Sequence, residues 1–158
     1  ITADGQSGRL VDLFRNESVI GFHTHWQSLF SNGRSTGLTD WRVTLGRIQE
    51  HFGARVKWMK CSELAEVTIA QAVTTHTVTE NAEGIEVSLT SPICCPDFTA
   101  TLHTEKEIQS VSVGETRLKA LPDNTHVLEP NSWSRQRGSV TWCADLSVGG
   151  DLVRLSHL

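Results

Sequence analysis

The spacing of hydrophobic positions along the chain changes near residue 73. Before that point, apolar residues recur every three or four positions, as they do on one face of a helix. The clearest example predicts a helix over residues 38–52, and its apolar positions are Leu38, Trp41, Leu45, Ile48 and Phe52. Weaker patterns predict two further helices, at residues 7–16 and 62–72.

Two short segments between these helices predict buried strands. Val19-Ile20-Gly21-Phe22 is an uninterrupted apolar run next to turn-forming residues, which is typical of a parallel strand covered on both faces. Arg55 to Met59 alternates between polar and apolar residues like a short strand. The order helix, strand, helix, strand, helix over residues 1–72 favours a segment of a (β/α) barrel.

From residue 73 to the C-terminus, the pattern predicts short strands separated by turns. Thr, Val and Ser are abundant there, as strands favour. The expected strands are Thr74–Thr79, Ile85–Thr90, Phe98–Thr104, Ile108–Val113, His126–Glu129, Ser139–Leu146 and Leu152–His157. This spacing is typical of an antiparallel β-sandwich. The predicted fold class is therefore mixed α+β, with a partial (β/α)-barrel segment at 1–72 and an antiparallel β-sandwich domain at 73–158.

The residues with candidate functional side chains lie where the first predicted strand ends, at His23-Thr24-His25-Trp26. Side chains alternate along a strand, so His23 and His25 are expected to point the same way. A histidine titrates near neutral pH and can give a proton to a leaving group. Two imidazoles on one strand face could also bind a metal ion. The alternative is that both histidines only hydrogen-bond to loop backbone.

Three neighbouring residues could contact a substrate. Trp26 could stack on a sugar ring, or it could be a core residue beneath the following loop. Asn32 and Arg34 could bind substrate hydroxyl groups. Clusters of this type more often only form a turn.

This stretch resembles a known family. Ser18-Val19-Ile20-Gly21-Phe22-His23-Thr24 resembles the last barrel strand of polysaccharide deacetylases. The likeness extends over about residues 8–72, through His25–Gly33, Thr36–Leu38, Val56–Trp58 and Ser62–Ala65. It is similar to the C-terminal end of barrel proteins of this type that carry an appended β-sandwich.

The resemblance implies removal of acetyl groups from a carbohydrate substrate. In that family a divalent metal, usually zinc, is held by an aspartate and two histidines in an H-x-x-x-H arrangement. A second aspartate is the general base, and a histidine late in the barrel is the general acid. Only the last role carries over here, to His23 first and His25 second.

The departures from the family pattern limit this expectation. No H-x-x-x-H and no Asp-Asp pair occurs, so the metal ligands are expected upstream of Ile1, and the chain alone is expected to be inactive. Because the chain begins with Ile1 rather than Met, we expect it to be processed, excised or incomplete. If the natural chain does start there, the resemblance implies ancestry only.

A non-catalytic module that binds carbohydrate or protein through the sandwich is the alternative. A carbohydrate-binding face could include His76, His103, Trp133 and Trp142. Of these, Trp133 is predicted to be exposed in a loop, and Trp142 to be buried in a strand. Trp41 and Trp58 are predicted core residues.

A third option, a barrel-derived glycosidase, would need two opposed carboxylates. The carboxylates of the second half are predicted to be solvated surface groups, and they are Glu105, Glu107, Glu115 and Asp123. None of them forms an identifiable pair in the sequence.

The composition of the chain argues against two classes of partner, nucleic acid and membranes. A net charge of -4 without a basic run argues against nucleic acid as a partner. No apolar stretch is long enough to cross a membrane.

The four cysteines form no C-x-x-C pair, so a structural zinc site is not expected. A disulfide from Cys94 or Cys95 to Cys143 and a set of free thiols both stay open. The compartment and the oligomeric state also stay open.

Overall fold

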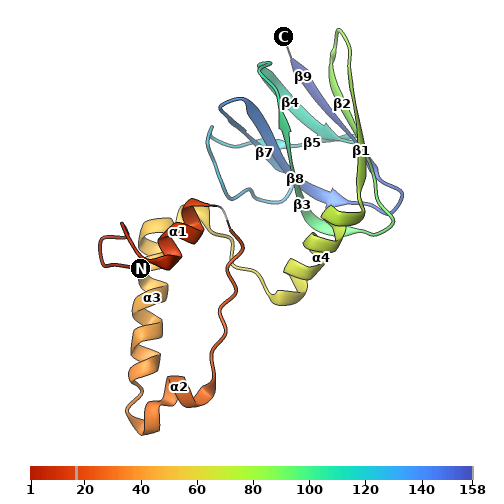
Figure 1. Cartoon of the computed structure of the whole chain (residues 1–158). Coiled ribbons are helices and arrows are strands. Elements are labelled where there is room, and N and C mark those ends of the chain that lie inside the picture. The colour runs from red at the N-terminus through yellow and green to blue at the C-terminus, as the bar shows by residue number, and fades with distance from the viewer. Residues whose placement is uncertain (17, 158) are drawn as a thin grey trace. The chain divides into compact units, whose positions relative to one another are not determined.

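The computed structural model describes residues 1–16 and 18–157. It has a mixed α+β architecture and divides into two compact units, Ile1–Lys57 and Trp58–Leu158 (Figure 1). The first unit is helical, and the second contains two β-sheets and one helix.

The first unit is built around its longest helix. Its elements are α1 (Arg9–Arg15), α2 (Trp26–Phe30), η1 (Ser31–Gly33), α3 (Thr36–Phe52) and η2 (Gly53–Arg55). The predicted helix at 38–52 is confirmed as most of α3. Phe14 of α1 stacks on Phe52 of α3 with ring centroids 4.6 Å apart. Val11 of α1 and Ile48 of α3 are fully buried.

The two strands predicted in this half do not form. Residues 18–25 are extended, but none of them is paired in a sheet. Phe22 instead packs edge-on against Trp41 of α3, with centroids 5.1 Å apart, and Val19 is exposed. Residues 56–60 are likewise outside any sheet. A strand requires a hydrogen-bonding neighbour, and among the described residues of this half there is none, so no barrel segment is present in them.

The second unit has the arrangement of a β-sandwich. One sheet has the order β1-β2-β9-β4-β5 and the other has the order β3-β8-β7-β6. Every pairing is antiparallel except β6 with β7. The strands are β1 (Thr75–Glu80), β2 (Gly84–Thr90), β3 (Cys95–His103), β4 (Ile108–Val113), β5 (Thr116–Arg117), β6 (Lys119–Ala120), β7 (Ser132–Gln136), β8 (Ser139–Leu146) and β9 (Asp151–His157).

The core of the sandwich joins both sheets. Trp133 of β7 and Trp142 of β8 are cross-strand partners and therefore share one face. Both belong to the buried cluster that includes Ile85 and Leu155 of the opposite sheet. Burial of Trp142 is confirmed. The prediction of an exposed Trp133 is wrong, because its side chain is 5% exposed.

Helix α4 (Cys61–Val73) belongs to the second unit and leads directly into β1 (Figure 1). Ala70 is fully buried in a second apolar cluster with Cys95, Phe98 and Leu146. The first turn of α4 is capped by the Glu63 carboxylate, which accepts a hydrogen bond of 2.8 Å from the Lys60 N–H. The division between the compact units thus falls between residues 57 and 58 of the chain, whereas the hydrophobic period changes near residue 73.

Strand β7 was missed by the sequence pattern because its second face carries small polar residues. Ser132 donates a hydrogen bond of 2.6 Å to the Glu129 carbonyl oxygen, and Ser134 donates one of 2.9 Å to that of Pro122. The connection from β6 to β7 thus covers these two serines, which are buried. The strand predicted at His126–Glu129 is wrong, since these residues form part of that connection.

The turn between β8 and β9 predicts unequal effects of two similar substitutions. Gly149 and Gly150 have φ values of 89° and 107°. A Cβ on Gly150 would lie 1.8 Å from the Leu89 carbonyl oxygen, whereas one on Gly149 meets nothing within 4 Å. Gly150→Ala should therefore cost about 3 kcal/mol of unfolding free energy, and Gly149→Ala about 1 kcal/mol.

Urea unfolding followed by near-ultraviolet circular dichroism of the buried tryptophans measures this difference. Equal losses in the two variants would contradict the close approach of Gly150 to β2.

Candidate functional site

The first candidate site lies on the extended segment before α2. The rings of His23 and His25 meet edge to face with centroids 4.6 Å apart. Directly after them, Trp26 and Phe30 stack with centroids 4.9 Å apart and an interplanar angle of 18°. The chain thus carries a pair of contacting imidazoles immediately before a pair of stacked aromatic rings. Both histidines are exposed.

The aromatic pair is open to solvent. Trp26 is 68% exposed and Phe30 is 43% exposed. Positions i and i+4 of a helix lie one above the other, so α2 presents both rings on one side. Trp26 is therefore not a core residue of this unit. Phe30 was not singled out in the sequence, although its spacing from Trp26 could have identified it.

A compact turn holds α2 against α3. The Ser31 hydroxyl donates a hydrogen bond of 2.8 Å to the Ser28 carbonyl oxygen and accepts one of 3.0 Å from the Gly37 N–H. A Cβ on Gly37 would lie 2.1 Å from that same Ser28 oxygen, so only glycine fits there. Asn32 and Arg34 are exposed within this turn, and neither has a side-chain hydrogen bond or ion pair among the described residues.

The histidine pair does not complete a metal site with other described residues. Within residues 1–16 and 18–157, no group of three His, Cys, Asp or Glu side chains is placed to hold a metal ion. The side chains present therefore do not fit the three-ligand set that the resemblance implies.

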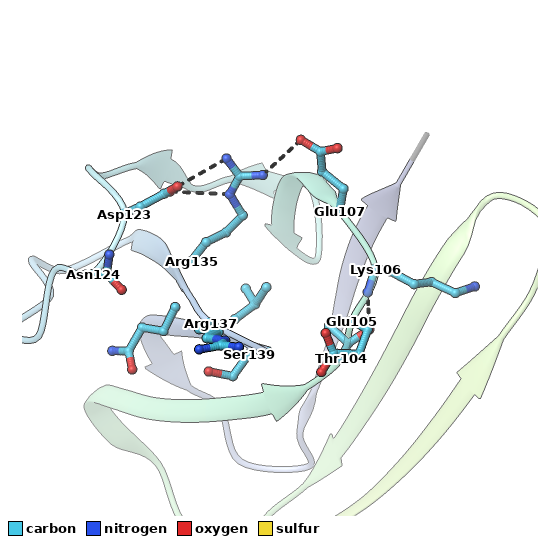
Figure 2. Close-up of a pocket in the computed structure, with 12 residues that line it drawn as sticks. Thr104, Glu105, Lys106, Glu107, Asp123, Asn124, Arg135, Arg137 and Ser139 are labelled. Carbon is cyan, nitrogen blue, oxygen red and sulfur yellow. Dashed lines mark hydrogen bonds and ion pairs between the residues drawn. The ribbon is translucent and has the colours of Figure 1, made fainter.

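A second candidate site is a polar pocket of about 400 Å³ in the β-sandwich (Figure 2). It lies where the connection between β3 and β4 meets the turn between β7 and β8. Its lining residues are Thr104, Glu105, Lys106, Glu107, Asp123, Asn124, Arg135, Gln136, Arg137, Gly138, Ser139 and Val140. No aromatic ring is among them, so sugar stacking is not available in this pocket.

Arg135 is held rigidly at the rim of the pocket. Its Nε lies 3.3 Å from Oδ1 of Asp123, and its Nη1 lies 3.3 Å from Oε1 of Glu107 (Figure 2). These interactions, with the Asp123 hydrogen bond as the largest, raise the pKa of Arg135 above its ordinary value. In Figure 2 the Lys106 side chain points away from Arg135. It forms an ion pair with Glu80 of β1. The pocket therefore has one rim fixed by ion pairs.

Other polar groups in the pocket are free to meet a ligand. Among the described residues, Glu105 and Arg137 have no ion pair, and the side chains of Asn124 and Gln136 have no hydrogen bond. The pocket thus offers the carboxylate of Glu105, the guanidinium of Arg137 and the uncharged amides of Asn124 and Gln136. Sequence reasoning missed it because its residues come from three separated segments and only the fold brings them together.

The face proposed from His76, His103, Trp133 and Trp142 does not exist. Trp133 and Trp142 lie in the core between the sheets, whereas His76 and His103 are exposed on β1 and β3. Trp58, predicted as core, is 52% exposed. It lies between η2 and α4, outside any helix or strand.

Comparison of the chain with protein-family models, with curated proteins and with solved structures finds no match. Across the part of the chain that the structure describes, no helix combines the length and the apolar character needed to cross a membrane.

The cysteines give a test of the core beside α4. None of the four is in a disulfide in this structure: Cys61 and Cys94 are exposed, and Cys95 and Cys143 are buried. Burial also raises the pKa of Cys95, and a thiol reacts as its thiolate. Iodoacetamide should therefore modify Cys61 and Cys94 in the native protein, and the other two only after unfolding.

Peptide mass spectrometry over a time course resolves the adjacent Cys94 and Cys95. A disulfide between Cys95 and Cys143, or equal reaction of Cys94 and Cys95, would contradict this arrangement.

Proposed function

We propose that this chain is part of a carbohydrate deacetylase and forms a sugar-facing edge of its active site. The observation that carries the proposal is the exposed aromatic pair beside two histidines, at Trp26 and Phe30 with His23 and His25. An exposed tryptophan costs solvation free energy in a free protein, and a sugar ring covers such a surface well. The resemblance of residues 8–72 to polysaccharide deacetylases points to the same chemistry.

The role assigned to the histidines is proton donation. Deacetylation breaks the bond between the acetyl carbon and the sugar nitrogen or oxygen, and the leaving atom needs a proton. An imidazolium at His23 or His25 could supply it, while Trp26 holds the sugar. Because the described residues do not fit the metal-ligand set of the resembled family, the assigned role stops at sugar binding and proton donation.

Histidine substitutions test the catalytic part in the natural gene product that contains this chain. His23→Ala or His25→Ala should lower kcat for N-acetylglucosamine oligomers about 100-fold, as loss of a general acid does. Circular dichroism should be unchanged because both side chains are exposed. Released acetate is the measured product, and His103→Ala is the matched control on an exposed strand end.

Full activity in both histidine variants would refute the assignment. Trp26→Ala separates binding from catalysis, since loss of stacking should raise KM by about tenfold and leave kcat close to that of the wild type.

The polar pocket of the sandwich favours a second candidate function, non-catalytic binding of a saccharide. Its volume of about 400 Å³ accommodates a sugar residue, and its free groups match hydroxyl donors and acceptors. Arg137 and Glu105 are the groups best placed to contribute, because they have no ion pair among the described residues.

Binding by the 158-residue chain distinguishes the two candidates. In a nuclear magnetic resonance titration with N-acetylglucosamine oligomers, a sandwich site predicts that Arg137→Ala weakens binding about tenfold. Arg117→Ala, which removes an exposed arginine of β5 outside the pocket, should have no effect. Shifts confined to the Trp26 indole would exclude the pocket as the site.

A further inference from the structure

The four sheet edges of the sandwich are not equally protected. Edge strands β5 and β6 contain two residues each. Edge strand β3 has an irregular register between Cys95 and Phe98, and α4 packs beside it through Ala70. Short strands, bulges and covering helices are the usual means of protecting an edge. Edge strand β1 has none of these.

Strand β1 is a long and regular edge. All six residues of Thr75–Glu80 pair with β2 without a register shift, and all six are exposed. The strand contains no Pro and no Lys. Because β1 has a neighbour on one side only, the backbone groups on its other side face solvent. Such an edge is a template for another strand.

We propose that β1 pairs antiparallel with β1 of a second copy of this chain about a two-fold axis. The pairing joins the two five-stranded sheets into one continuous sheet. A two-fold interface brings the same surface patch of both copies together, so the sequence of β1 must complement itself. It does so in one register.

Face alternation restricts the register. Val78 pairs with Val87 of β2, and Glu80 pairs with Ile85, both of which are buried in the core. His76, Val78 and Glu80 therefore lie on the inner face of the sheet. Residues directly opposite in a ladder share a face, so each inner residue of one copy must meet an inner residue of the other.

The register centred on Val78 satisfies this condition and matches side chains. Val78 meets the second copy's Val78, and Thr77 meets the second copy's Thr79. His76 then faces the second copy's Glu80 and Glu80 faces the second copy's His76, which gives two pairs in which an imidazole N–H can donate to a carboxylate. The register centred on Thr77 would instead place His76 opposite Val78, with no such pair.

The exposure of Val78 and the charge of Glu80 both favour this contact. Val78 is 47% exposed in the single chain, and pairing would bury it against its own copy. Lys106 forms an ion pair with Glu80, and its hydrogen bond is the main reason why the pKa of Glu80 is lowered. The Glu80 carboxylate therefore stays charged opposite His76. An interface of one strand pair is small, so the expected Kd is on the order of 10–100 µM.

Sedimentation velocity of the 158-residue chain, over about 1–300 µM to bracket that Kd, tests the proposal. The wild-type chain should shift from monomer to dimer across this range. Val78→Lys places two like charges on the axis and should leave the chain monomeric throughout. Val148→Lys, at an exposed position in the turn between β8 and β9, is the control and should dimerise as the wild type does.

Two substitutions at one position test the register with opposite signs. His76→Lys should lower the dimer Kd about three- to tenfold, since it strengthens both pairs with Glu80. His76→Glu should raise the Kd by a similar factor. Because His76 is exposed on an edge strand, neither change should alter the fold.

Cross-linking locates the axis. In a background of Cys61→Ser and Cys94→Ser, which removes the exposed thiols, Val78→Cys should form an intermolecular disulfide on mild oxidation. Thr77→Cys should not, because it faces Thr79. A wild-type chain that stays monomeric, or a dimer unaffected by Val78→Lys, would overturn the proposal.

Discussion

The packing of the two sheets against each other is the constraint on which the second unit depends. Trp133 and Trp142 from one sheet meet Ile85, Val111 and Leu155 from the other. The first of these sheets has four strands and the second has five. β1 lies at the edge of the five-stranded sheet, and both of its faces are exposed. The same packing draws the β3–β4 and β7–β8 connections together and so builds the polar pocket.

The sequence pattern predicted elements whose side-chain period matched their burial. β4 and β8 begin and end where the alternation placed them, and α3 follows its apolar stripe. Prediction failed where burial came from a loop rather than from another strand or helix. Ser132 and Ser134 look like loop residues, yet they lie in β7 because the preceding connection covers them and accepts their hydrogen bonds. Trp133 between them points to the other face of the strand and lies in the core between the two sheets.

The two candidate sites likewise differ in how far they could be predicted from the sequence. The spacing of His23, His25 and Trp26 was visible in the sequence because these residues are neighbours. The structure adds the ring contact between the histidines and the partner ring of Phe30. The pocket could not be predicted, since Glu105, Asp123 and Arg137 meet only after three separated segments are brought together by the sheets. Their charges alone were indistinguishable from those of a solvated surface.

Residues 18–25 and edge strand β1 differ in what it costs them to lack a hydrogen-bonded strand on one or both sides, because their side chains differ. Residues 18–25 carry an apolar run, with Val19 exposed to water. β1 has one neighbour and carries polar side chains at every position except Val78. Unpaired backbone groups can bind water at little net cost, whereas exposed apolar side chains lose free energy in proportion to their area. The mainly polar edge of β1 is therefore stable alone, whereas Val19 would gain from a surface that covers its side chain.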